Sequence, residues 1–387
     1  MYKIHVLNNL SSAGLSRLDP KKYKLVENIK DPDAILVRSF NMHDMPLPES
    51  VKVVGRAGVG TNNIPVQQLT MLGIPVLNTP GANANAVKEL VITGMLLASR
   101  NICSAWDYTR QIEGDDDALN QQVEKHKKQF AGFELPGKVL AVIGLGKIGV
   151  KVANAAKQLG MQVIGYDPAI TIRSAWELSS DVNQADTMKD ALNHADFVTL
   201  HVPLTHHTEH LINADYLKIM KPNVVLLNFA RARIVDNDAV AAALEKNHIR
   251  NYVCDFPSNQ FKHHPRVISL PHLGASTKEA EENCALMVVE QVQDYLENGA
   301  IQNSVNFPNV KLPRGEGYRL AIANRNVPKM VAQISTALSD TNNNIIDMIN
   351  KSRDDIAYTM LDVSNPISDE VLSHIGKIDG VIRARRL

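Results

Sequence analysis

Short apolar runs alternate with amphipathic stretches in the N-terminal part of the chain. The runs predict buried strands over Ile4–Leu7, Ala34–Val37, Val51–Val54 and Ile74–Leu77. Val87–Ser99 is apolar around much of its helical circumference and predicts a helix. Residues 101–130 are polar and are expected to be helical, with a solvated turn at Asp115–Asp117.

A second series of apolar runs begins at Lys138. It predicts strands over Val139–Ile143, Gln162–Tyr166, Phe197–His201, Val224–Leu227, Tyr252–Cys254 and Val267–Leu270. Helical patterns lie between most of these runs, and Asp236 is well placed to cap a helix over Asp238–Lys246. Near-continuous apolar strands that alternate with helices are typical of a parallel sheet covered on both faces, so we expect a doubly wound α/β fold.

The C-terminal part shows a different pattern. Cys284–Glu297 predicts a helix, and Phe307–Gly317, with its prolines and glycines, predicts a linker. Beyond the linker the order is βαββαβ, which predicts a small ferredoxin-like sandwich. Its elements are a strand around Tyr318–Ile322, a helix from Pro328, strands over Asn344–Asn350 and Tyr358–Val363, a helix over Asp369–Ile375 and a strand over Val381–Arg385.

A glycine-rich turn follows the first strand of the second series. Gly144, Gly146 and Gly149 fit the pattern GxGxxG, and an amphipathic helix follows them. In this setting the glycines let the backbone approach a pyrophosphate, and the helix N-terminus supplies N–H groups and a positive dipole end. Asp167 closes the next strand, where a carboxylate accepts hydrogen bonds from ribose hydroxyls and repels a 2′-phosphate. The sequence therefore predicts a dinucleotide site that prefers NAD to NADP.

Composition narrows the choice of partners. Lys and Arg together number 41, as do Asp and Glu, so the formal net charge is zero and we expect neither a nucleic-acid nor a membrane partner. The basic end with Arg383, Arg385 and Arg386 is interpreted as a solvated strand edge. Three scattered cysteines suit neither disulfides nor a metal site, and the first residues carry no signal-peptide pattern, so we predict a cytoplasmic protein without metal.

Polar residues gather where the predicted strands of the second series end. Ligands bind beyond the carboxyl ends of such strands. Hydride transfer from a hydroxyl-bearing carbon to NAD leaves a proton that needs a base near neutral pKa, and His272, directly after a buried strand, is the candidate. Arg231 can bind a carboxylate bidentately and polarise a carbonyl. His201 also ends a strand and is given a supporting role.

These segments together resemble the D-2-hydroxyacid dehydrogenase family. The resemblance rests on Arg56–Gly60, Gly144–Gly149, Asn228–Asp236 and Pro271–Thr277. It implies two Rossmann-like domains: a discontinuous substrate domain (1–97 and 285–307) and an inserted NAD domain (98–284). The predicted cofactor contacts are Gly144, Gly146, Lys147, Ile148, Gly149, Asp167, His201, Val202, Pro203, Thr208, Phe229, Ala230, Asp255 and Gly274.

Within the family, the chain most resembles the short-form D-3-phosphoglycerate dehydrogenases, as Asn303–Pro308 and the tail indicate. This implies oxidation of 3-phosphoglycerate to 3-phosphohydroxypyruvate for serine biosynthesis, a linker at 308–316, an ACT-like regulatory domain at 317–387, and a homodimer or homotetramer. Two alternatives stay open: another 2-hydroxyacid dehydrogenase or reductase, acting on glyoxylate or hydroxypyruvate, and a non-catalytic NAD-sensing regulator.

The resemblance also assigns residues and exposes departures. Arg38 and Arg56 match the substrate-binding arginines, and the backbone of Ala57, Gly58, Val59 and Gly60 is expected to hold the substrate carboxylate. Gln260 stands where the family has a Glu that orients the catalytic His; an amide can orient an imidazole but cannot stabilise imidazolium by charge. Ala232 and Lys329 replace usual glycines. Asn324, Asn326 and Asn344 match the positions of an ACT serine site.

Overall fold

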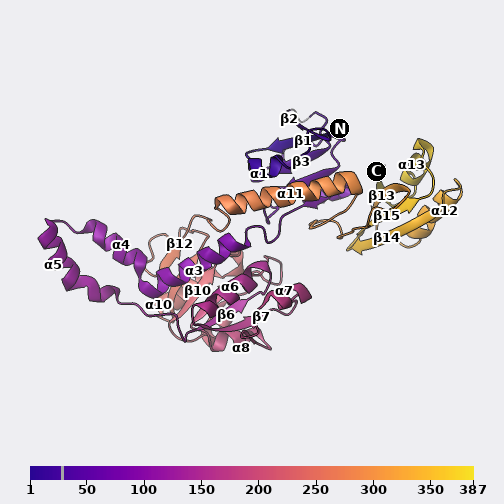
Figure 1. Cartoon of the computed structure of the whole chain (residues 1–387). Helices are drawn as coiled ribbons and strands as arrows, with labels where there is room; N and C mark the ends of the chain where they lie inside the picture. Colours follow the sequence, from indigo (N-terminus) through magenta and orange to yellow (C-terminus); the bar gives the residue numbers. More distant parts are fainter. Residues whose placement is uncertain (28–29) are drawn as a thin grey trace. The chain divides into compact units, whose positions relative to one another are not determined.

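The computed structural model describes residues 1–27 and 30–387 and divides into two compact units (Figure 1). Unit 1 comprises Met1–Ala82 and Lys278–Leu387, and unit 2 comprises Asn83–Thr277. The predicted domain boundaries near 98 and 285 lie inside helices α3 (Ala84–Arg100) and α11 (Lys278–Asn298), so the units change over at other positions. The finer domain division stays a prediction.

Unit 1 contains a parallel five-stranded sheet in the order β2-β1-β3-β4-β5. Its strands are β1 (Tyr2–Leu7), β2 (Tyr23–Val26), β3 (Ala34–Val37), β4 (Val53–Arg56) and β5 (Val76–Leu77), with helices α1 (Ser12–Leu15) and α2 (Val66–Met71) between them. Strands were predicted at four of these places; β2 was missed because only Tyr23 of its four residues is fully buried. Helix α11 packs against β4, where Gly55 lies beneath Val288 and Val292.

Unit 2 contains a parallel seven-stranded sheet in the order β12-β11-β10-β9-β6-β7-β8, as predicted for a doubly wound fold. The strands are β6 (Val139–Ile143), β7 (Gln162–Tyr166), β8 (Asn183–Gln184), β9 (Phe197–Leu200), β10 (Val224–Asn228), β11 (Ile249–Cys254) and β12 (Val267–Ser269). The helices around it are α6 (Lys147–Gln158), α7 (Ile172–Glu177), α8 (Met188–Asn193), α9 (Ala214–Ile219) and α10 (Asn237–Glu245), with 3-10 turns η1 (Lys127–Phe130) and η2 (Ala232–Ile234).

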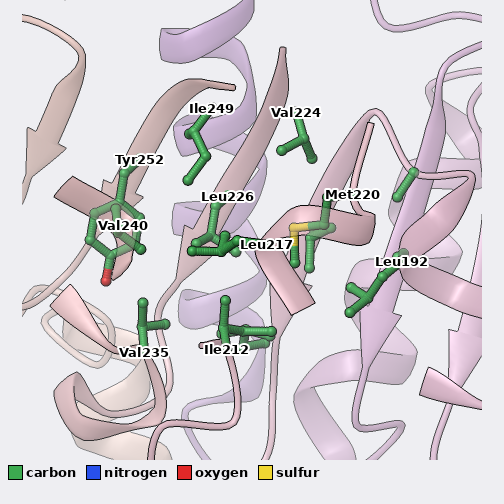
Figure 2. Packing of buried hydrophobic residues seen from close by; sticks show 14 of the residues in the cluster. Leu192, Ile212, Leu217, Met220, Val224, Leu226, Val235, Val240, Ile249 and Tyr252 are labelled. Atoms are coloured by element: carbon green, nitrogen blue, oxygen red, sulfur yellow. The ribbon is translucent and has the colours of Figure 1, made fainter. Parts of the chain in front are cut away.

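The central strands of unit 2 are buried on both faces. All five residues of β10 are buried, and Leu226 packs with Leu217, Ile212 and Val240 on one face (Figure 2). A strand covered on both sides has no polar alternation, which is why the sequence shows an unbroken apolar run there. The predicted cap at Asp236 is confirmed, since its carboxylate accepts from the amides of Asp238 and Ala239 at the start of α10.

Residues 101–130 are helical as predicted, but the turn was misplaced. They form α4 (Ile102–Gln111), α5 (Asp116–His126) and η1, and in Figure 1 α4 and α5 extend away from the sheet of their own unit. Asp115 caps α5 by accepting from the amide of Ala118, and Asp116 and Asp117 form its first helical turn. Acidic residues at a helix N-terminus favour the helix through its dipole, so this acidic run begins a helix where a turn had been expected.

The tail beyond the linker has the predicted βαββαβ order. Strands β13 (Tyr318–Arg325), β14 (Ile345–Arg353), β15 (Ile356–Val363) and β16 (Val381–Arg386) form an antiparallel sheet in the order β14-β15-β13-β16, with helices α12 (Met330–Ser339) and α13 (Asp369–Gly376). The helices and one face of the sheet share a hydrophobic cluster that includes Leu320, Ile334 and Leu361. The pairing is that of a ferredoxin-like sandwich, which confirms the predicted order.

The other face of the tail sheet packs on the rest of unit 1. Tyr358 and Met360 belong to the same cluster as Ile4 and Val53. Arg383 donates to the carbonyls of Val51 and Glu49, and Arg385 contacts the ring and carbonyl of Tyr295. The prediction of a solvated basic edge is therefore wrong for these two arginines, because the partly buried side chains satisfy backbone carbonyls.

No helix in the described part of the chain combines the length and the apolar content that a bilayer crossing requires.

Candidate active site

The polar residues singled out in unit 2 line one edge of its sheet. Because all seven strands are parallel, their carboxyl ends meet at the same edge. Along that edge the strand order places these groups in sequence: His272 after β12, Asp255 after β11, Arg231 after β10, His201 after β9, the glycine turn after β6 and Asp167 after β7. The direction of the strand order reverses between β9 and β6, so the glycine turn lies at the topological switch point of the sheet, where such folds bind their ligands.

The glycine turn has no room for side chains where it folds back on itself. Gly144 has φ +93°, and a Cβ there would lie 2.7 Å from the carbonyl oxygen of His201. A Cβ on Gly149 would lie 1.9 Å from the carbonyl oxygen of Gly144. At Gly146, which precedes helix α6, an added Cβ meets nothing within 4 Å. The turn is thus closed toward the protein and open beside the helix N-terminus, as a phosphate cradle requires.

Asp167 holds this turn as well as ending its strand. One carboxylate oxygen accepts from the amide of Leu145 at 2.8 Å, and the other accepts from the amide of Ala169 at 2.9 Å. Lys147, the first residue of α6, pairs with Glu177 at 3.2 Å. Ile148 packs against the cluster beneath the turn. The carboxylate therefore stands beside the glycine turn, at the place predicted for a ribose contact.

His201 is a neutral group at this edge. Its Nε2 lies 3.0 Å from Thr199 Oγ1, and burial lowers its pKa to about 3. A ring with this pKa is uncharged at pH 7 and serves as a polar wall, not as the acid or base of a reaction. Val202 and Pro203 follow it, and Thr208 closes their loop by donating to the Pro203 carbonyl at 2.6 Å.

Arg231 follows β10 in a locally fixed backbone. The amide of Asn228 donates to the Arg231 carbonyl at 2.9 Å, and its oxygen accepts from Ala230 N–H at 3.2 Å. Phe229 is buried against α3, where a Cβ on Gly94 would lie 2.9 Å from its ring. The Arg231 guanidinium donates to the Ala230 carbonyl at 2.6 Å and lies half-buried, and burial lowers its pKa. It remains a cation at neutral pH because a guanidinium releases its proton only far above pH 7.

Asp255 fixes the loop that carries His272. Its carboxylate is buried and accepts from the amides of Leu273 at 2.7 Å and Gly274 at 2.8 Å. Burial raises the Asp255 pKa, while these two amides act in the opposite direction. His272 itself has φ +57° and an exposed side chain whose ring lies edge-on to Phe256 at 5.2 Å. The buried carboxylate thus holds an exposed imidazole in a left-handed backbone conformation.

Among the described residues, Gln260 forms no hydrogen bond with His272. Its amide donates to the carboxylate of Asp238, at the start of α10, at 3.0 Å. The predicted partnership between Gln260 and the imidazole stays a prediction. Asp255 is the carboxylate that the structure connects to the histidine loop, and it does so through backbone amides.

In unit 1, Arg38 and Arg56 follow neighbouring strands β3 and β4. Arg56 Nε donates to the Arg38 carbonyl at 3.1 Å, so the two are directly linked. The Arg38 guanidinium pairs with Glu281 of α11 at 2.6 Å, with both side chains more than a third exposed. Sequence reasoning missed Glu281, because nothing in the pattern of α11 distinguishes it from other solvated acids.

Two of the four backbone N–H groups in the turn at Ala57–Gly60 already form hydrogen bonds within the chain. Ala57 N–H donates to the Val37 carbonyl, and Gly58 N–H donates to the Arg56 carbonyl. A Cβ on Gly58 would lie 1.9 Å from the Arg56 guanidinium, so this glycine leaves space for the arginine. Of the four amides of this turn, those of Val59 and Gly60 have no backbone hydrogen bond to another described residue.

The tail brings two of its three predicted asparagines together. Asn324 and Asn326 line a cavity of about 250 Å³ with Lys329 and Asn350. Asn344 lies beyond the other end of β14, where it bonds Ser364. Lys329 has φ +68°, a conformation that glycine adopts without strain.

Comparisons with known proteins can now be set beside this geometry. Residues 93–274 match the family described as D-isomer specific 2-hydroxyacid dehydrogenase, NAD binding domain. The chain is 37% identical over 340 residues to a D-3-phosphoglycerate dehydrogenase of Methanocaldococcus jannaschii, an alignment that covers 85% of this chain but only 61% of that longer relative. It is 32% identical to a D-3-phosphoglycerate dehydrogenase of Haemophilus influenzae, with 98% of this chain and 94% of the relative covered. The crystal structure of NAD⁺-bound 3-phosphoglycerate dehydrogenase from Entamoeba histolytica superposes with a TM-score of 0.64 at 26% identity, covering 79% of this chain and 98% of that one.

Proposed function

The chain belongs to the D-isomer specific 2-hydroxyacid dehydrogenases, and on that premise we propose that it oxidises 3-phosphoglycerate to 3-phosphohydroxypyruvate with NAD. The observation that carries the proposal is the order of groups along the sheet edge of unit 2. A held imidazole, a cation and a phosphate cradle follow strands β12, β10 and β6, so they lie at the same edge of one sheet. The reaction supplies the precursor of serine biosynthesis.

The residues at the switch point fit a dinucleotide. The space beside Gly146 and the N-terminus of α6 suit a pyrophosphate, and the Asp167 carboxylate suits a ribose diol and disfavours a 2′-phosphate. The neutral ring of His201 forms a wall without adding charge. When bound, NAD supplies the acceptor for the hydride that leaves C2 of the substrate.

Two side chains carry the proton and the charge of the reaction. His272 takes the proton from the substrate hydroxyl, and its exposed position lets the ring exchange that proton with water afterwards. Arg231 holds the substrate carboxylate and polarises the oxygen that becomes a carbonyl; its half-buried position strengthens this interaction. Asp255 keeps the His272 loop in place through the Leu273 and Gly274 amides.

The phosphate group distinguishes the proposed substrate from smaller hydroxy acids. Arg38 and Arg56 are the cations proposed to bind it, and the amides of Val59 and Gly60 are proposed to contact the carboxylate. The Arg38–Glu281 pair is exposed and therefore weak, so a doubly charged phosphate can displace the glutamate. Glyoxylate and hydroxypyruvate, the alternative substrates, lack the group that would require Arg38.

The tail is proposed to be an ACT-like regulatory domain that binds serine. The cavity beside Asn324 and Asn326 supports this; Asn350 also lines it, whereas the predicted Asn344 lies beyond the other end of β14. Self-association is proposed through α4, where Ile102 and Trp106 lie one turn apart and are 46% and 61% exposed. Light scattering with and without serine tests both ideas; a monomer in both conditions would contradict the second.

The decisive experiment measures NADH formation with 3-phosphoglycerate, D-glycerate and D-lactate as substrates. We expect the phosphorylated acid to give the highest kcat/KM, and His272→Asn to lower kcat by about 10²- to 10⁴-fold. Preference for an unphosphorylated acid would favour a different dehydrogenase of the family. NAD binding without turnover of any acid would favour the non-catalytic regulator.

A further inference from the structure

Glu281 places a carboxylate against the arginines at the strand ends of unit 1. Its Oε1 lies 2.6 Å from a terminal nitrogen of Arg38, and the Arg38 carbonyl in turn accepts from Arg56 Nε at 3.1 Å. Both side chains of the ion pair are more than a third exposed, so an anion from solvent can reach the Arg38 guanidinium. The glutamate therefore holds the position at which the phosphate of the proposed substrate is expected.

The helix that carries Glu281 is packed tightly against the rest of unit 1. A Cβ on Gly55 of β4 would lie 2.7 Å from the Val288 side chain of α11, and a Cβ on Gly14 of α1 would lie 2.5 Å from the Ala285 backbone. Such close contacts leave the helix backbone little freedom. The Glu281 side chain can turn aside for an anion, but its charge then stays within a side chain's length of the guanidinium.

Cys284 indicates that Arg56 belongs to the same group of charges. It follows Glu281 by about one turn of α11, and burial raises the pKa of its thiol. The charges of Arg56 and Arg38 act to lower that pKa, and the charge of Glu281 acts to raise it, so all three lie near one sulfur. Two cations and one anion leave this group with a single net positive charge.

An anion that binds Arg38 has to exchange with the glutamate. Losing an exposed ion pair costs little, but every oxyanion meets this cost, and the displaced carboxylate still repels the bound ligand. An acid whose carboxylate also contacts the Val59 and Gly60 amides has a second anchor, which offsets the cost. A free inorganic oxyanion has no such anchor. The glutamate thus lowers the affinity of the subsite to a level at which ligands held at both ends are bound and single oxyanions are not.

We propose that Glu281 sets the affinity of the phosphate subsite by competing with oxyanions for Arg38. In the free protein it keeps the subsite clear of inorganic oxyanions, and it gives way to a phosphorylated acid. The inference rests on the proposed role of Arg38 and Arg56 in phosphate binding. It goes beyond that role because it predicts a gain of affinity when a charged residue beside the substrate is neutralised.

Calorimetric titration of the full chain with 3-phosphonooxypropanoate tests the proposal without turnover. This probe is 3-phosphoglycerate without its C2 hydroxyl, so it keeps both anchors and cannot be oxidised there. At constant ionic strength and pH 8, Glu281→Gln should bind the probe and inorganic phosphate about two- to fivefold more tightly than wild type, the range for an exposed ion pair. The matched control is Glu279→Gln, which neutralises an exposed acid in the same first turn of α11 and should change neither affinity.

Steady-state kinetics supplies a second readout. Glu281→Gln should lower KM for 3-phosphoglycerate by the same factor without changing kcat, and should leave KM for D-glycerate as in wild type; a merely structural role would move both. Adding Arg38→Met to Glu281→Gln should abolish the gain. Equal affinities in Glu281→Gln and wild type, or an equal gain in Glu279→Gln, would overturn the proposal. If no acid is turned over, the proposed reaction fails, and the calorimetric contrast still decides this inference.

Discussion

Arg319 in the tail sheet and Arg231, which follows strand β10 of unit 2, meet different surroundings. Arg319 of β13 is fully buried and donates five hydrogen bonds, two to Asp362 and three to the carbonyls of Asn298, Leu312 and Pro313. Arg231, which follows β10, donates a single bond to a neighbouring carbonyl, and Arg250 has a buried nitrogen with no partner in the described chain. Arg319 uses all five of its N–H donors within the fold, whereas Arg231 uses one of its donors within the described residues.

This difference separates structural from functional cations better than exposure does. A guanidinium with every nitrogen engaged stabilises the fold and has nothing left for a ligand. One that is held in place by the backbone and keeps free donors is prepared for an anion without further reorganisation. If this interpretation holds, removing an arginine of the first kind should change stability, and removing one of the second kind should change chemistry.

The largest effect is expected from Arg319→Ala. Asp362 would remain buried without its partner, and breaking a buried pair in this way costs about 3–5 kcal/mol. Urea unfolding measures the change. The control is Arg386→Ala, whose pair with Asp369 is mostly exposed and should cost less than about 1 kcal/mol. Similar losses in the two variants would contradict the distinction.

Arg231→Gln should give the converse result. Loss of the cation is expected to lower kcat/KM about 10²- to 10³-fold, since a fixed electrostatic donor at the reacting oxygen contributes that much. The free energy of unfolding should change little, because the side chain makes only one hydrogen bond. Steady-state kinetics and urea unfolding on the same sample test both halves; a stability loss comparable to that of Arg319→Ala would mean that Arg231 is structural.

His201 offers a pH test of the same edge. Burial lowers its pKa to about 3 from the ordinary 6.5, so the unfolded chain binds one more proton between these values. The contribution of His201 to the free energy of unfolding should therefore be fully present above pH 6.5. It should fall as the pH drops below that value, by at most about 1.4 kcal/mol per pH unit. His201→Asn should flatten this slope in urea titrations at several pH values. The exposed His263→Asn should leave it unchanged.

The smallest effect concerns Lys329. Its φ of +68° disfavours any side chain, and Lys329→Gly should stabilise the tail by about 1 kcal/mol. Lys377→Gly, at an ordinary helix end with φ −90°, should give no gain. Thermal unfolding resolves the two. If the cavity beside Asn324 binds serine, the glycine variant should also bind it more tightly, because Lys329 lines that cavity.

The sequence predicted what depends on periodicity and on chain order. Six of the seven strands of unit 2 were placed to within a few residues because buried strands leave apolar runs, whereas the exposed two-residue strand β8 was not predicted. The glycine turn was found because its neighbours are a strand and a helix. Side-chain partners could not be predicted in this way. Gln260 bonds Asp238, Arg38 pairs with Glu281 and Arg385 stacks on Tyr295, and each of these contacts joins elements that are distant in sequence. Periodicity says nothing about such choices.

Strand β16 packs closely against Gly73, and this contact bears on whether the tail can be removed or exchanged. A Cβ on Gly73 would lie 2.8 Å from that of Arg383, so the last strand rests directly on the end of α2. Cutting the chain at the linker would uncover the apolar surface that Tyr358 and Met360 now cover and would strip the Val51 and Tyr295 carbonyls of their donors. A shortened protein without the tail is therefore expected to aggregate, and a tail grafted from a relative would succeed only if its last strand could lie as close to Gly73.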